Sequence, residues 1–209
     1  MFLNSVDQQL LLLIDSLSER SNIAKHFYLA GGTGLALQLG HRTSVDIDLF
    51  TPDCFNSELY STAITERGGQ VIQAEEGGVH GVVSGVKVSF LLYPYKMLQP
   101  LQPFHGIHIA SIADIAAMKA VAISQRGDKK DFFDMYEILK EMSPHDLKTH
   151  FLDKFSEARI NCYHILKSFF YFDDADRQPD PISLNGTTWD QVKVFFVSNE
   201  KMLMRELVC

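Results

Sequence analysis

Residues 44–50 alternate between apolar and polar side chains, which is the period of a β-strand with two unlike faces. The apolar face consists of Val45, Ile47 and Leu49. Asp46 and Asp48 lie on the opposite face. The pattern therefore predicts a strand that buries one side and presents two carboxylates on the other.

The front half of the chain combines further strands with a few helices. Short runs of apolar and β-branched residues predict strands at 26–30, 70–74, 81–83 and 87–92. Glycine turns separate the last three strands and indicate an antiparallel meander. Helical periodicity predicts a helix at 6–20, and residues 56–68 are expected to form a surface helix. Thr33 is predicted to cap a short helix that ends at Gly40.

The second half of the chain is predicted to be helical. Capping residues and apolar periodicity predict helices at 112–126, 130–141, 158–171 and from residues 144 and 188 onward. The polar stretch 173–187 is predicted to be a loop. The fold class is therefore α+β: a mixed sheet with flanking helices over residues 1–110, followed by a helical region, 111–209, packed on that core.

Charge and cysteine content narrow the functional classes. The 209 residues carry a formal net charge of −7, which disfavours a broad surface for duplex nucleic acid but permits a local basic pocket. The three cysteines lack metal or redox spacing and are expected to be free thiols. No basic leader precedes the first apolar run, and no stretch reaches the roughly 20 apolar residues of a membrane span. These features favour a cytoplasmic protein.

The two carboxylates Asp46 and Asp48 are the first candidate site. Residues two apart on a strand point the same way, roughly 6 to 7 Å apart, so the two charges repel. A bound Mg²⁺ would reverse that repulsion; the alternative is an exposed edge strand with solvated acids. Gly31-Gly32 before a helix suits the close approach of a phosphate, and Arg42 would pair with phosphate or carboxylate. His41 is expected to be an exposed loop residue.

A second candidate site lies on the predicted helices 112–126 and 130–141. Lys119 and Arg126, seven residues apart, share one face of the first helix, and Asp131 and Asp134 share a face of the second. A lysine among alanines is expected to be partly buried and to need an anion. That anion is either a carboxylate in a structural ion-pair network or a nucleotide triphosphate.

Four segments carry a resemblance to a known family: GGT (31–33), RTSVDIDLF (42–50), MKAVAISQR (118–126) and KDFFDMY (130–136). In this order they resemble the AbiEii/AbiGii toxin family, within the nucleotidyltransferase superfamily that includes DNA polymerase beta. The resemblance implies transfer of a nucleotidyl group from an NTP to an acceptor, such as tRNA or a protein, and a cognate antitoxin partner.

The resemblance also implies roles for individual residues. Asp46 and Asp48 would hold Mg²⁺, and Asp131 would act as the base for the attacking hydroxyl. The nucleotide would be bound by Gly31, Gly32, Thr33, Arg42, Lys119 and Arg126. The catalytic set is therefore Asp46, Asp48, Lys119 and Asp131.

The chain departs from the family pattern at Ser89. Members with two metals place a third carboxylate on a later strand, and the matching position here is a serine. Three explanations remain open. The enzyme works with one metal and uses Asp131 as its base, another acid such as Glu75 or Glu76 reaches the site, or the domain binds a nucleotide or a partner without catalysis.

Overall fold

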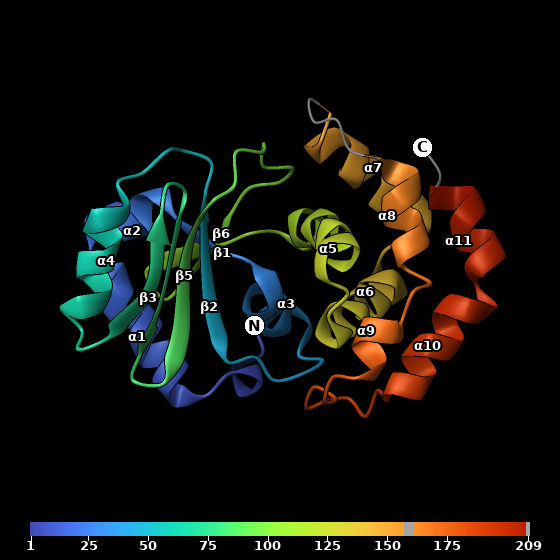
Figure 1. Cartoon of the computed structure of the whole chain (residues 1–209), viewed down its shortest axis with the longest axis horizontal. Coiled ribbons are helices and arrows are strands. Elements are labelled where there is room, and N and C mark those ends of the chain that lie inside the picture. Colours follow the sequence, from blue (N-terminus) through green and yellow to red (C-terminus); the bar gives the residue numbers. More distant parts are fainter. Residues whose placement is uncertain (157–160, 208–209) are drawn as a thin grey trace.

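The computed structural model describes residues 1–156 and 161–207, and its strands form one mixed sheet (Figure 1). The strands are β1 Tyr28–Leu29, β2 Asp46–Thr51, β3 Gln70–Glu75, β4 Gly78–Val83, β5 Val86–Leu92, β6 Gln102–Phe104 and β7 Ile107–Ile109. Their order across the sheet is β3-β4-β5-β2-β1-β7-β6. The pairs β2–β5 and β1–β7 are parallel and the others antiparallel, so the predicted mixed sheet and the β3–β4–β5 meander are confirmed.

Helices cover both faces of the sheet and continue beyond it (Figure 1). Those of the front half are α1 Gln8–Ser18, α2 Ser21–His26, α3 Gly31–Leu39 and α4 Ser57–Thr65. Those of the second half are α5 Ile112–Arg126, α6 Lys129–Glu141, α7 Pro144–Lys154, α8 Cys162–Ser168, α9 Asp173–Asp176, α10 Trp189–Ser198 and α11 Glu200–Leu207. The helix α3 lies between the sheet and the pair α5–α6.

Alternating side chains give the strand β2 its two roles. Ile47 and Leu49 are fully buried and pack with residues of α1 and α4 in one hydrophobic cluster. Asp46 and Asp48 are half-buried on the other side, as the alternation predicts, in the wall of a cavity that α5 also lines. Val45 is an exception, because it precedes the strand and is 62% exposed.

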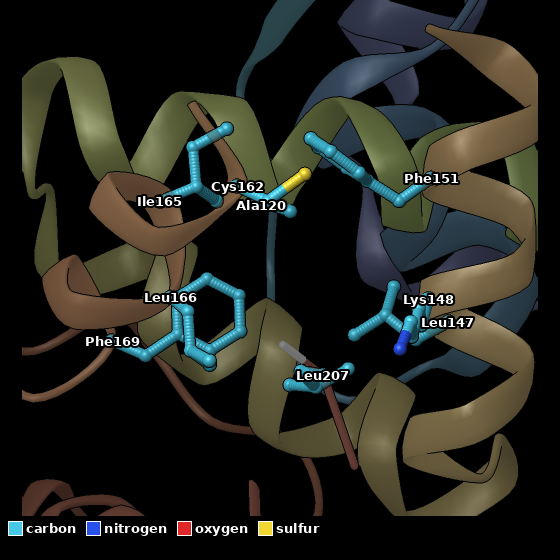
Figure 2. Close-up of a pocket in the computed structure, with 9 residues that line it drawn as sticks. All are labelled: Ala120, Leu147, Lys148, Phe151, Cys162, Ile165, Leu166, Phe169 and Leu207. Atoms are coloured by element: carbon cyan, nitrogen blue, oxygen red, sulfur yellow. The ribbon is translucent and has the colours of Figure 1, made fainter. Parts of the chain in front are cut away.

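A second hydrophobic cluster joins the sheet to the helical region. It runs from Leu35 of α3 through the small residues of α5 to Phe196 of α10. It includes a cavity of about 30 Å³ between α5, α7 and α8, lined mainly by apolar side chains (Figure 2). That space is far below the roughly 300 Å³ of a typical small-molecule site, so it is not a candidate nucleotide site. The predicted division of the chain into a core, 1–110, and a helical region, 111–209, stays a prediction.

Several predicted boundaries are corrected. Residues 102–109 form the hairpin β6–β7, which the prolines of this segment hid from the sequence patterns, and Pro103 is tolerated because β6 is an edge strand. The expected final helix is two helices, α10 and α11. Part of the predicted helix 158–171 falls outside the described residues. Cys54 is a free thiol as expected. Cys162 is disulfide-bonded, so the expectation of a free thiol is wrong there. Cysteine spacing could not show this, because a disulfide depends on which thiols the fold brings together.

The stretch predicted as a free polar loop, 173–187, contains the short helix α9 and then returns to the front half of the chain. The Thr43 amide donates to the Ile182 carbonyl over 2.9 Å, and the Leu184 amide donates to the His41 carbonyl over 2.8 Å. This long-range pairing places residues 180–182 beside β2. In the described part of the chain, no helix combines the length and apolar character needed to cross a membrane.

Candidate active site

Strand register places the two predicted carboxylates opposite Lys87 and Ser89 of the neighbouring strand. In the β2–β5 pair, Asp46 aligns with Lys87 and Asp48 aligns with Ser89. Burial raises the pKa of the Asp48 carboxyl above its ordinary value, and the charge of Asp46 raises it further. The Nζ of Lys130, on α6, lies 3.8 Å from Asp46. Asp46 and Asp48 therefore form a like-charged pair on one face of the sheet.

The glycines before α3 allow the chain to approach these carboxylates. Gly31 has φ +63°, and a Cβ built on it would lie 2.9 Å from Asp48 Oδ2. A Cβ on Gly32 would collide with the guanidinium of Arg42. The N-cap of α3 is Ala30, so the prediction that Thr33 caps this helix is wrong. The Thr33 hydroxyl instead donates to the Asp46 carbonyl and lies 2.8 Å from Ser44 Oγ, which ties α3 to the start of β2.

Lys119 and Asp134 are the centre of a buried charge network between α5, α6 and the segment before β2. Lys119 Nζ lies 2.7 Å from Asp131 and 2.5 Å from Asp134. Arg42 donates to both oxygens of Asp134, over 2.7 and 2.9 Å, and His41 Nε2 lies 2.7 Å from the same carboxylate. Burial alone would raise the pKa of Asp134, but Arg42, Lys119 and His41 hold it well below its ordinary value.

His41 differs most from its prediction. Its side chain is 2% exposed and bonded to Asp134, so the expectation of an exposed loop histidine is wrong. The Arg42 guanidinium also donates to the Thr43 carbonyl over 2.9 Å, so its described bonds go to a carboxylate and to backbone. Of the two partners weighed for Arg42, the structure shows the carboxylate.

Asp131 is paired with cations on both of its oxygens. Lys119 donates to one oxygen over 2.7 Å, and Arg126 reaches both over 2.7 and 2.9 Å. Burial raises the pKa of Asp131, but Lys119 and Arg126 more than offset this and lower it. A buried carboxylate with a lowered pKa is a weak proton acceptor, so this geometry suits a residue that positions Lys119 and Arg126. The Arg126 side chain is 51% exposed and remains accessible from the cleft.

Two cavities of about 390 Å³ each meet at these residues. Both have Asp48, Ser89, Lys119 and Arg126 in their walls, so we describe them as two lobes of one cleft. The polar lobe is also lined by Gly32, Arg42, Asp46, Lys87, Lys130 and Asp180. The aromatic lobe is also lined by Phe50, His80, Tyr93, Tyr95, Met118 and Phe155.

The carboxylate pair fits one divalent cation. Mg²⁺ takes one or two carboxylates together with substrate phosphates, and Asp46 and Asp48 offer such a donor set. Their mutual repulsion and the raised pKa of Asp48 are the penalty that a bound cation relieves. Within residues 1–156 and 161–207, no three histidine, cysteine or acidic side chains converge as a metal site. A second metal would therefore lack a third fixed carboxylate.

The sequence patterns missed some residues that line the cleft. Two of them could have been named from the sequence, because Lys87 belongs to the predicted strand 87–92 and Lys130 opens the KDFFDMY segment. Asp180 and Ile182 had no local signal, since only the long-range return of residues 180–184 brings them there. Glu75 and Glu76 are exposed at the β3–β4 turn and line neither lobe, which disfavours the one of the three explanations in which such an acid reaches the site.

The family model for the nucleotidyl transferase AbiEii toxin of type IV toxin–antitoxin systems matches residues 15–89 and 82–192. The chain belongs to this family. An Aquifex aeolicus protein, the uncharacterized protein aq_aa25, is 36% identical over 180 residues, which is 83% of this AbiEii-family chain and 86% of the relative. The resemblance found in the sequence is therefore confirmed.

Solved structures share the fold at low sequence identity. The nucleotidyltransferase toxin MenT4 of Mycobacterium tuberculosis superposes with a TM-score of 0.58 and 15% identity, covering 96% of the AbiEii-family chain and 87% of MenT4. A putative nucleotidyltransferase of Helicobacter pylori superposes with a TM-score of 0.56 and 15% identity, covering 99% and 96%. These likenesses show a nucleotidyltransferase fold.

Gly31→Ala tests the close approach of the helix to Asp48. The added Cβ is expected to cost about 1–2 kcal/mol through its left-handed φ and to displace the Asp48 carboxylate. Gly68→Ala is the matched control, because Gly68 has φ +70° and nothing lies within 4 Å of its added Cβ. Thermal unfolding should show similar losses for both variants, while only Gly31→Ala loses stabilisation by Mg·NTP. Equal nucleotide stabilisation in both variants would contradict this contact's role.

Proposed function

We propose that this AbiEii-family chain transfers a nucleoside monophosphate from an NTP to an acceptor hydroxyl. The observation that carries the proposal is the composition of the cleft. Asp46, Asp48 and Lys119 line the same cavity. Arg126 and Lys130 line it too, and their side chains are partly exposed. Carboxylates for a cation and cations for phosphates are the groups that phosphoryl chemistry requires.

The polar lobe is the nucleotide site in the proposed reaction. The polar lobe takes the triphosphate, with Arg126, Lys130 and Lys87 as its accessible cations. Gly31, Gly32 and Thr33 contribute the first-turn amides of α3, which have no carbonyl partner within the helix. Asp46 and Asp48 would hold Mg²⁺, which supplies positive charge against the transferring phosphoryl group.

The charge network supports these groups from behind. Asp131 and Asp134 hold Lys119 at the junction of the lobes, and Asp134 also holds Arg42. Lys119 is buried yet its pKa is raised, because the two carboxylates more than offset the effect of burial. It therefore stays charged and lines both lobes of the cleft, and we place the departing pyrophosphate beside it.

The proposed partners follow from the family. We place the chain in the cytoplasm as the toxin of a toxin–antitoxin pair, with a cognate antitoxin as its protein partner. The acceptor is a tRNA or a protein hydroxyl. With a net charge of −7, RNA would be held by the basic groups of the cleft and not by a broad basic surface.

The second candidate is a domain that binds a nucleotide without transferring it. It is favoured by Ser89, which stands where a third carboxylate is expected and offers no charge to a metal. This candidate predicts a fully formed polar lobe and no turnover.

One experiment separates the two functions. The protein is incubated with each α-³²P-labelled NTP, total tRNA and MgCl₂, with EDTA in a parallel reaction. We expect label in RNA or in protein only in the presence of Mg²⁺, and with one preferred NTP. Thermal stabilisation by Mg·NTP without label in either fraction would identify the binding domain. The absence of both label and stabilisation would overturn both proposals.

A further inference from the structure

Three side chains form a row across the central strands at the floor of the aromatic lobe. Ser89 of β5 aligns with Asp48 of β2 on one side and with His80 of β4 on the other. His80 Nδ1 lies 3.1 Å from Ser89 Oγ, and Ser89 lies beside Asp48 on the neighbouring strand. All three residues line the aromatic lobe. The position that lacks the expected carboxylate is therefore connected to an imidazole.

The contact between Ser89 and His80 bears on which ring nitrogen of His80 is available in the cleft. A serine hydroxyl can accept as well as donate, so Ser89 Oγ can accept a hydrogen from His80 Nδ1. In the tautomer that carries its hydrogen on Nδ1, His80 donates to Ser89. The same tautomer leaves a lone pair on Nε2, which is the arrangement of a histidine that accepts a proton.

Other groups near the row are less suited to accept a proton. Asp131 is buried between Lys119 and Arg126, and its pKa is lowered. The remaining titratable or charged groups that line the aromatic lobe are Tyr93, Tyr95, Lys119 and Arg126. Burial raises the pKa of Tyr93, and the cations have no lone pair to offer. His80 is the described side chain of this lobe with a free basic nitrogen.

We propose that His80 is the proton acceptor of the transfer reaction and that Ser89 is its positioning residue. The inference rests on the proposed function and specifies it. The acceptor hydroxyl, held in the aromatic lobe, loses its proton to His80 Nε2. Its oxygen forms a bond to the α-phosphorus of the NTP, the bond from that phosphorus to the bridging oxygen breaks, and pyrophosphate leaves with the electron pair. Ser89 holds the Nδ1 side of the resulting imidazolium.

The test uses His80→Ala, Ser89→Ala and the double variant His80→Ala with Ser89→Asp. Transfer of α-³²P-NMP to total tRNA is measured at saturating and limiting NTP, and the melting temperature of each variant is recorded. We expect His80→Ala to lower kcat about 10²-fold or more with little change in the KM for NTP. Ser89→Ala is expected to lower kcat about tenfold. Added imidazole should partly restore His80→Ala, and the Ser89→Asp double variant should recover transfer by supplying the carboxylate.

Each outcome bears on a different proposal. Wild-type transfer with an unchanged kcat in His80→Ala overturns the assignment of His80 and leaves the proposed function intact. A loss in His80→Ala that neither imidazole nor Ser89→Asp relieves, with a lowered melting temperature, shows a structural role and also overturns it. Absence of transfer in the wild type overturns the proposed function, and this inference with it.

Discussion

Asp134→Ala is expected to lower the free energy of unfolding by about 3 to 5 kcal/mol, because it strands two buried cations. Asp134 is fully buried and pairs with Arg42 and Lys119, whose side chains are 4% and 3% exposed. Once the carboxylate is gone, Arg42 has only the Thr43 carbonyl and Lys119 only Asp131 among the described contacts. The total free energy of unfolding of a native domain is about 5 to 15 kcal/mol, so urea unfolding at pH 7 should show a large loss of stability.

The control for Asp134→Ala is Asp153→Ala. Asp153 pairs with Lys96 over 2.5 Å at the surface, where both side chains are more than half exposed, so its removal should cost at most about 1 kcal/mol. The loss also has a pH signature. The pKa of Asp134 lies well below its ordinary 3.8, so its contribution is full above about pH 4 and fades as the pH falls through the folded value. Equal stability of the two variants at pH 7 would refute the network's role.

The sequence was sufficient where the signal is local. Alternation in residues 44–50 located the strand and its two acids, since a strand's side-chain period is two. Capping by Ser111 and termination at Gly127 located α5, and with it the shared wall that carries Lys119 and Arg126. The carboxylates and these cations could thus be assigned to one site before their distances were known.

The sequence was insufficient where contacts join distant segments. Nothing near His41 indicates that residues 182–184 pair with residues 41–43 or that Asp134 lies within hydrogen-bond distance of His41 Nε2. The proposed role of His80 depends on strand register, because β4 had to align it with Ser89. A missing carboxylate at Ser89 was visible in the sequence, but its neighbour across the sheet was not.

Asp48→Asn is expected to abolish nucleotidyl transfer while stabilising the fold. Removing one of the two carboxylates should lower kcat/KM about 10³-fold or more, since charge stabilisation of a transferring phosphoryl group amounts to several kcal/mol. Burial and the charge of Asp46 raise the pKa of Asp48, so its ionised form opposes folding at neutral pH. The neutral amide should therefore raise the melting temperature, by about 2–4 °C for each kcal/mol gained in a chain of this size.

The sign of this stability effect separates a site from a structural ion pair. A raised carboxyl pKa favours folding below that pKa and opposes it above, so the advantage of Asp48→Asn should vanish in acid and grow toward neutral pH. Asp53→Asn is the matched control, because Asp53 is exposed just beyond the same strand and should change neither transfer nor stability. A melting temperature lowered by Asp48→Asn would show that the carboxylate is held by internal cations. It would then belong with Asp134 among the structural groups, and the case for a cation-binding pair would fail.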